Sequence, residues 1–193
     1  MSLGPAGPPG EAGRSKSAPT DFVDAEVDVV VIGGGPGGST AAALLAEAGH
    51  RVVLLEKSRH PRFHIGESLL PAIVPLLQRL GVASQVAAIG LAKHGVEFFS
   101  PAHAQPQRFD FADSWNKTLC HAYEVRRSSF DAILAARAAS LGAHVVEGCR
   151  AREVEFRGED GVEVLSQRED GARQCWRARY LIDASGRDTL LGT

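Results

Sequence analysis

The stretch VDVVVIGGGPGG, residues 27–38, decides the fold of this chain. It begins with a continuous apolar run rich in valine, which is typical of a strand buried on both faces of a parallel sheet. The run passes directly into Gly33, Gly35 and Gly38, which have the spacing GxGxxG. In that spacing the first glycine permits a tight turn, the second lets a ligand approach the backbone, and the third lets a helix pack on the strand. The stretch therefore predicts a strand, a glycine turn and a helix.

The residues that follow complete a strand–helix–strand unit. Residues 36–49 are rich in alanine and end in glycine, as a helix does, and residues 50–56, HRVVLLE, predict a second strand. Glu56 ends that strand 23 residues after Gly33, where a carboxylate can bind both ribose hydroxyls and repels a 2′-phosphate. The helix N-terminus directs N–H groups and a positive dipole at phosphates. The unit predicts binding of FAD or NAD, not NADP, through Gly33, Gly35, Pro36, Gly37, Gly38, Glu56 and Lys57.

The composition is that of a globular protein with one domain. The chain has 193 residues, 44% hydrophobic and 23% charged, with a formal net charge of −2. This balance argues against nucleic acid or an anionic membrane as a partner, and no apolar run approaches the roughly 18 residues of a transmembrane helix. Cys120, Cys149 and Cys175 form no CxxC pair, which indicates reduced thiols and a cytoplasmic protein. Residues 1–26, which lack a signal-peptide core, are expected to form a disordered tail, and residues 27–193 one cofactor-binding domain.

Beyond Glu56 the apolar pattern switches between helical and strand periodicity. The predicted helices are residues 67–82, 83–90 and 127–142. Three short strands, residues 94–100, 107–113 and 119–125, are expected to form an antiparallel layer inserted between the parallel elements. Residues 143–148 predict another parallel strand. Residues 151–186 alternate around two turns, at 159–161 and 169–171, and predict a β-meander.

The last strand of the meander favours FAD over NAD. It leads into LIDASGRDT, residues 181–189, where Ala184, Ser185 and Gly186 are small. The carboxyl ends of strands line the cofactor crevice of a doubly wound sheet, and small residues there let a long cofactor pass close by. The order of predicted elements resembles the glutathione-reductase-type fold of FAD-dependent monooxygenases. We expect an α/β, three-layer fold of the FAD/NAD(P)-binding type with an antiparallel β layer.

A more specific resemblance is carried by PRFHIGESLLP, residues 61–71, together with the glycine-rich stretch. These segments resemble the N-terminal part of flavin-dependent halogenases that act on phenols or on carrier-tethered pyrroles and phenols. Related GES loops occur in geranylgeranyl reductases, so the loop alone does not define the chemistry. The resemblance implies that Gly66, Glu67 and Ser68 lie beside the flavin. The residues alone allow a second, compatible interpretation, in which Ser68 caps the N-terminus of the next helix.

Lys93, in LAKHGVEFF at residues 91–99, matches the lysine that the halogenases use. In that family, reduced flavin and O2 oxidise halide, and the hypohalous acid reaches the lysine, which delivers electrophilic halogen to an electron-rich ring. The resemblance thus implies Lys93 as the catalytic residue, with FAD and halide as co-substrates. It also implies a separate flavin reductase and an aromatic substrate that is free or tethered to a carrier protein. By itself, a lysine at the start of a strand would be interpreted as solvated.

Three further residues are assigned to the cofactor by the same resemblance. Arg127, in YEVRRSSFD, matches an arginine that contacts FAD, with Arg126 as the neighbour that could be mistaken for it. Asp183 and Gly186 belong to the late DASG signature. Phe130 and Asp131 are interpreted as structural. Residues 60 and 64 are both histidine, but no further ligand completes a metal set, and Ser68 and Ser185 lack the partners of a hydrolase triad.

The chain departs from the halogenases in what it lacks. Their second half carries a Trp-x-Trp-x-Ile-Pro motif, which neither Trp115 nor Trp176 matches. We therefore expect the chain to be the N-terminal part of a longer FAD-dependent halogenase, without full activity of its own. The alternatives are a flavin monooxygenase or geranylgeranyl-reductase-like oxidoreductase, in which Lys93 has no function, and a non-catalytic FAD-binding module.

Overall fold

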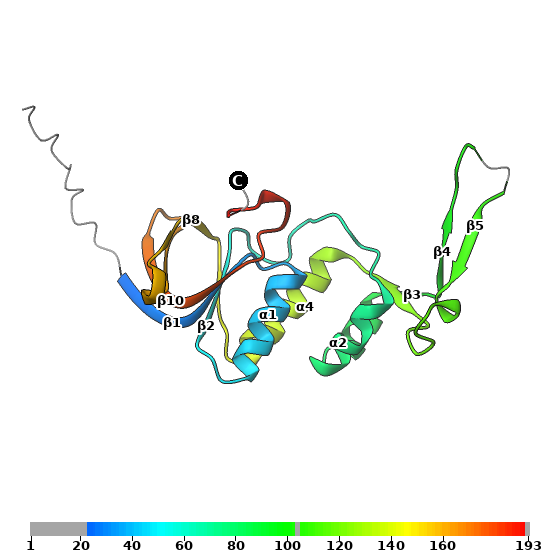
Figure 1. Cartoon of the computed structure of the whole chain (residues 1–193), viewed down its shortest axis with the longest axis horizontal. Coiled ribbons are helices and arrows are strands. Elements are labelled where there is room, and N and C mark those ends of the chain that lie inside the picture. The colour runs from blue at the N-terminus through cyan, green and yellow to red at the C-terminus, as the bar shows by residue number, and fades with distance from the viewer. Residues whose placement is uncertain (1–22, 103–104, 192–193) are drawn as a thin grey trace, which may run out of the picture.

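The computed structural model describes residues 23–102 and 105–191, and Figure 1 shows their arrangement. Strand β1 (Val23–Ile32), helix α1 (Pro36–Glu47) and strand β2 (Val52–Glu56) form the predicted parallel unit, with Val29 of β1 opposite Val52 of β2. Strand β1 begins at Val23, so residues 23–26 belong to the sheet and not to the predicted tail. The rest of that predicted tail lies outside the described residues.

Four later strands join this unit to make a sheet of six, and two of them are parallel to it. Helix α4 (Arg127–Ser140) leads into β7 (His144–Glu147), which pairs parallel to β2 and confirms the predicted return to the parallel sheet. Strand β10 (Arg173–Asp183) pairs parallel to β1 on its other side. The order of the strands is β7-β2-β1-β10-β9-β8, where β9 is Val162–Arg168 and β8 is Cys149–Phe156. Because β1, β2 and β10 are parallel neighbours, they end at the same edge. That edge is where a doubly wound sheet binds its ligand.

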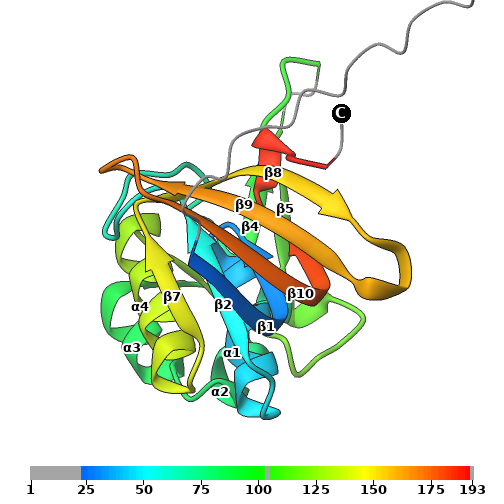
Figure 2. The same cartoon turned by 90° about the vertical axis from the view of Figure 1, so that its left-hand side faces the viewer.

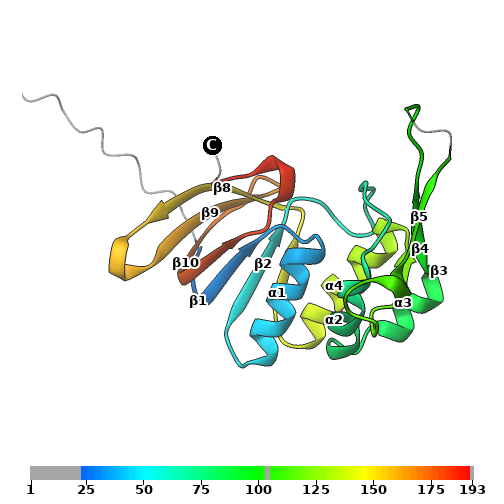
Figure 3. The same ribbon diagram turned by 45° about the vertical axis from the view of Figure 1, so that its right-hand side comes forward.

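The predicted meander is present and supplies the third layer. Strands β8 (Cys149–Phe156), β9 (Val162–Arg168) and β10 are antiparallel neighbours, and the 3₁₀ turn η3 (Gly158–Asp160) precedes β9. Figures 2 and 3 show that β9 and β8 continue the sheet beyond β10, away from the helices. The sheet curls so that β8 and β9 pack against the face of β1 and β2 that the helices leave uncovered.

Alternate residues of β1 and β2 enter two separate cores. Val31 and Leu54 pack under α1 and α4 with Phe130, whereas Val30 and Val53 pack against the meander. Each of these side chains is almost completely buried, which contributes about 1.5–3 kcal/mol apiece. Burial on both faces explains why the two strands are apolar throughout. The fold is therefore the predicted three-layer α/β fold of the FAD/NAD(P)-binding type.

The segment between β2 and α4 differs most from the prediction. Instead of one helix over 67–82, residues 67–70 are extended, and the helical part is the 3₁₀ turn η1 (Pro71–Ile73) followed by α2 (Val74–Arg79). Both prolines stand at the start of these elements, because proline lacks the N–H that an interior position needs. Helix α3 (Ala83–Ile89) follows as predicted.

The predicted antiparallel layer is two separate pairs of strands. Strand β3 (Leu91–Lys93) pairs with β6 (Ala122–Glu124), and β4 (Gly95–Phe98) pairs with β5 (Gln107–Asp110). The β4–β5 ribbon projects from the body in Figures 1 and 3, followed by the 3₁₀ turn η2 (Phe111–Asp113). A last 3₁₀ turn, η4 (Gly186–Asp188), follows β10. No helix in the described part of the chain is long and apolar enough to cross a membrane.

Candidate cofactor site

Two glycines of the GxGxxG stretch are required by the fold itself. Gly33 has a φ of 102°, and a Cβ there would lie 2.4 Å from the carbonyl oxygen of Ala184. A Cβ on Gly38 would lie 1.9 Å from the carbonyl oxygen of Gly33. Both contacts are with backbone atoms that cannot move aside, so these glycines allow β1, β10 and α1 to meet at the turn.

At two other glycines, a Cβ would enter open space and not clash with the protein. Gly35 is the N-cap of α1, and a Cβ on it would be 3.8 Å from the nearest atom, Nη2 of Arg62. Among residues 23–102 and 105–191, no atom lies within 4 Å of a Cβ on Gly37. Both residues line a cavity of about 840 Å³ at the carboxyl edge of the sheet. A helix N-terminus without side chains over it forms a cradle in which phosphate oxygens can reach the backbone N–H groups.

The cavity gathers most of the residues predicted from the sequence to contact the cofactor. Its volume falls within the range of small-molecule sites. The predicted residues that line it are Gly33, Gly35, Pro36, Gly37, Glu56, Lys57, Arg127, Asp183 and Gly186. Because these residues end or follow β1, β2 and β10 or begin α1 and α4, the sheet topology brings distant parts of the sequence to one site.

Glu56 is held in place by donors from three parts of the chain. Its side chain is 3% exposed, and its Oε2 accepts hydrogen bonds from the N–H of Gly34 at 2.6 Å and from Nη2 of Arg62 at 3.3 Å. Its Oε1 accepts from the N–H of Ser58 at 2.9 Å. A carboxylate oxygen can accept two hydrogen bonds, so Oε1 retains capacity for a ribose hydroxyl.

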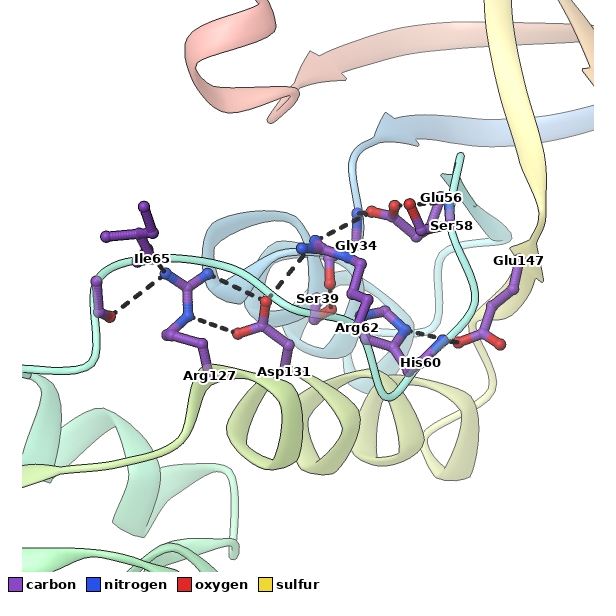
Figure 4. A network of polar contacts seen from close by, with 11 residues as sticks. Gly34, Ser39, Glu56, Ser58, His60, Arg62, Ile65, Arg127, Asp131 and Glu147 are labelled. Carbon is purple, nitrogen blue, oxygen red and sulfur yellow. Dashed lines mark hydrogen bonds and ion pairs between the residues drawn. The ribbon is translucent and has the colours of Figure 1, made fainter.

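Arg62 and Asp131 extend this contact into a buried charge network, which Figure 4 shows. Asp131 is completely buried and accepts two hydrogen bonds from Arg127, at 2.8 and 3.0 Å. Nη2 of Arg62 lies 3.7 Å from the same carboxylate and also contacts Glu56. The paired carboxylates therefore hold two guanidinium groups at the cavity wall, where both lie about 4 Å from the position of a Cβ on Gly35.

Sequence reasoning missed Arg62 and the role of Asp131. Asp131 could have been found, because it follows Arg127 by four residues in a predicted helix, the spacing of a facing ion pair. Arg62 lies in a loop, and nothing in its sequence neighbourhood indicates that its side chain turns inward. The loop is anchored to β7 by His60, whose Nδ1 lies 2.6 Å from Oε1 of Glu147 (Figure 4).

The charge of the cavity favours an anionic ligand. Basic side chains outnumber acidic ones in its lining; the basic residues are Lys57, Arg62, Arg127, Arg150 and Arg187, and the acidic ones Glu56 and Asp183. His64 also lines the cavity, and its pKa is lowered by partial burial and by the guanidinium groups of Arg127 and Arg62. The imidazole is therefore neutral at pH 7. Such a lining suits a pyrophosphate, which arginines bind through charge-assisted hydrogen bonds.

Asp183 orders the end of β10. Its carboxylate accepts hydrogen bonds from the N–H of Ser185 and from the N–H of Leu191, both at 3.0 Å, and from the Ser185 hydroxyl. Burial acts to raise the pKa of Asp183, but these hydrogen bonds outweigh it and the pKa lies below its usual value. The carboxylate is therefore ionised at the edge of the cavity.

This lowered pKa predicts how the stability contributed by Asp183 depends on pH. A depressed carboxyl pKa stabilises the fold above the unfolded-state pKa of about 3.9, and that contribution is lost as pH falls through the folded-state pKa. The difference in free energy of unfolding between the wild type and Asp183→Asn should stay constant from about pH 7 to 5 and shrink only below about pH 4. Urea denaturation across this range measures it. A difference that instead grows as the pH falls through about 6 would mean a raised pKa.

Five predicted residues lie outside the lining of the cavity: Gly38, Gly66, Glu67, Ser68 and Lys93. Gly66 remains close, because its carbonyl oxygen accepts a hydrogen bond of 3.4 Å from Arg127, and the carbonyl of Ile65 accepts another of 3.0 Å. Ser68 accepts a hydrogen bond from Nζ of Lys93. The alternative interpretation of Ser68 as a helix cap is wrong, since Leu70 precedes η1 and no side chain caps it.

The chain matches the family described as FAD binding domain over residues 26–192. It belongs to the FAD-binding domain family. FAD is accordingly its cofactor, and the open cradle at Gly35 and Gly37, the basic lining and Glu56 all fit that cofactor. The prediction of FAD over NAD is confirmed.

Known relatives of this FAD-binding domain include halogenases. It is 37% identical over 179 residues to the flavin-dependent halogenase armH3 of Armillaria mellea, covering 89% of this chain and 34% of that protein. It is 34% identical to the 1H-pyrrole-2-carbonyl-[peptidyl-carrier protein] chlorinase of Pseudomonas fluorescens, covering 88% of this chain and 41% of that one. The structure of the myxobacterial chondrochloren halogenase CndH superimposes with a TM-score of 0.79 at 38% identity, over 86% of this chain and 38% of that chain. The chain thus spans between 34% and 41% of the length of these relatives.

Proposed function

We propose that the protein halogenates an electron-rich aromatic or pyrrole substrate with Lys93 as its catalytic residue. The contact between Lys93 and Ser68 carries the proposal, because it joins the lysine to the segment that Arg127 holds beside the FAD cavity. The similarity to named halogenases supports the same activity. When bound and reduced, FAD supplies with O2 the oxidising power that turns halide into an electrophilic halogen species.

The residues of the cavity would divide the binding of FAD between them. The N–H groups of Gly35 and Gly37 and the guanidinium groups of Arg62 and Arg127 would bind the pyrophosphate, and Glu56 the adenosine ribose. Lys57, Asp183 and Gly186 line the same cavity, whereas Gly66 and Glu67 lie on the segment next to it. Buried pairing of the charges keeps these groups oriented before the ligand arrives, which lowers the cost of binding.

Lys93 would act on the electrophilic halogen species and not on the flavin. Its ammonium group carries three N–H donors and a positive charge. The Ser68 hydroxyl takes one donor, and the remaining donors can hold the oxygen of a hypohalous acid. A positioned N–H that strengthens its hydrogen bond as negative charge develops on that oxygen assists transfer of the halogen to the ring.

The partners follow from the same proposal. The chlorinase of Pseudomonas fluorescens named above acts on a pyrrole attached to a peptidyl-carrier protein, which supports a tethered substrate as well as a free one. A separate flavin reductase would supply reduced FAD. We also propose a cytoplasmic location, supported by Cys120, Cys149 and Cys175, which are free thiols in the structure.

Replacing Lys93 with alanine tests the function. In the protein expressed from its complete reading frame, with reduced FAD, O2, halide and a phenol or pyrrole, Lys93→Ala should lower halogenated product at least about 100-fold. Mass spectrometry detects the product by the isotope pattern of the halogen. Lys117→Ala, at an exposed lysine outside the cavity lining, is the matched control and should retain activity. Undiminished product from Lys93→Ala would exclude this role. A halide-independent hydroxylated product would instead indicate a monooxygenase.

A further inference from the structure

The Lys93 side chain is held by two neighbours that have no charge. Its Nζ donates a hydrogen bond to Oγ of Ser68 and lies 5.9 Å from the centroid of the Phe111 ring. The side chain is half-buried. Throughout residues 23–102 and 105–191, no carboxylate forms an ion pair with it. Its positive charge is therefore oriented by a hydroxyl oxygen and an aromatic face without being neutralised.

Backbone pairing determines how Ser68 reaches this position. The N–H of Leu69 donates to the carbonyl of Tyr123, and the N–H of Val125 donates to the carbonyl of Glu67, both at 2.9 Å. Ser68 thereby forms an antiparallel bridge with Glu124 of β6. The extended segment 67–69 is a short third strand, with β6 between it and β3.

The register places Ser68 and Lys93 on one face of these three strands. Glu124 lies opposite both Ser68 and Leu91, and residues directly opposite one another share a face. Lys93 follows Leu91 by two residues and therefore points to the same side. Ala122 of β6 lies opposite Lys93 and is completely buried. Because its side chain is only a methyl group, the Lys93 side chain can extend across β6 to the segment 67–69. Glu67, next to Ser68, alternates to the other side.

We infer that Ser68 is a positioning residue for Lys93 rather than a contact of the cofactor. The inference rests on the proposed function, in which Lys93 is catalytic. The Ser68 hydroxyl accepts one N–H of the ammonium group, so the other two N–H donors and the full positive charge remain available to a ligand. A carboxylate in the place of the hydroxyl would compete with the ligand for these donors and for the charge. Ser68 does not line the FAD cavity, which is consistent with this role.

The hydrogen bond can be observed directly in this chain. Its lysines are Lys16, Lys57, Lys93 and Lys117, so ¹⁵N NMR of the ammonium groups gives few signals, and the loss of one in Lys93→Arg assigns Lys93. A hydrogen-bonded ammonium exchanges its protons with water slowly enough to be detected. In Ser68→Ala the exchange of Lys93 should accelerate roughly tenfold or more, and the signal should broaden. Ser68→Thr, which keeps the hydroxyl and suits an extended segment, should restore it.

Kinetics of the complete protein separate positioning from cofactor binding. Ser68→Ala should lower kcat for halogenation roughly tenfold, with the FAD dissociation constant unchanged. Weaker FAD binding at unchanged kcat would overturn the inference and assign Ser68 to the cofactor. A Lys93 signal that is already broadened in the wild type, or equally sharp in Ser68→Ala, would also overturn it. The proposed function fails separately, through an active Lys93→Ala variant.

Discussion

Asp131→Ala is expected to lower the free energy of unfolding by about 3–5 kcal/mol, because it leaves buried positive charge without a partner. Asp131 is completely buried, Arg127 is 11% exposed and Arg62 16% exposed. The substitution removes the bidentate contact with Arg127 and the ion pair with Arg62 together. Urea denaturation followed by circular dichroism measures the change.

An exposed pair of the same residue types provides the control for this effect. Arg108 and Asp110 form an ion pair at 3.0 Å, with side chains 71% and 44% exposed. Asp110→Ala should cost under about 1 kcal/mol, since water screens that pair. If Asp131→Ala destabilised the protein no more than Asp110→Ala, the network would not be the rigid support of the cavity wall that we describe.

Gly35→Ala is expected to weaken FAD binding at least about 100-fold while the protein stays folded. Its Cβ would meet only Arg62 and Arg127, at 3.8 and 4.0 Å, but would project into the cradle where the phosphates approach. Loss of glycine at the N-cap should cost no more than about 1 kcal/mol of stability. Flavin fluorescence titration measures the affinity.

Gly38→Ala, three residues after Gly35, is expected to affect the stability of the protein rather than the binding of FAD. Its Cβ would lie 1.9 Å from the Gly33 carbonyl oxygen, so the protein itself should lose about 2–3 kcal/mol or more of stability. The two variants thus separate a glycine kept for the ligand from one kept for the fold. A Gly35→Ala protein that binds FAD as tightly as the wild type would contradict the assignment of the cradle.

The parallel unit, α4, β7 and the meander could be predicted from the sequence because their apolar patterns are long and regular. The place of Glu56 at the edge of the sheet could be predicted because it follows from the topology, whereas Arg127 was assigned to the cofactor only through the family resemblance. The extended segment 67–70 could not, since its apolar residues fit a helix equally well, and pairing with β6, distant in the sequence, decides its conformation. Arg62 was missed for a similar reason: its partners Glu56 and Asp131 come from other elements.

The absorbance spectrum of the purified chain after incubation with FAD and removal of the excess tests the central claim most directly. We predict a yellow protein with bound flavin, and a spectrum shifted from that of free FAD, because the cavity of about 840 Å³ has its cradle, basic lining and Glu56 in place. A protein that is folded by circular dichroism but colourless, and that shows no flavin binding on titration, would contradict the claim that these residues form the FAD site.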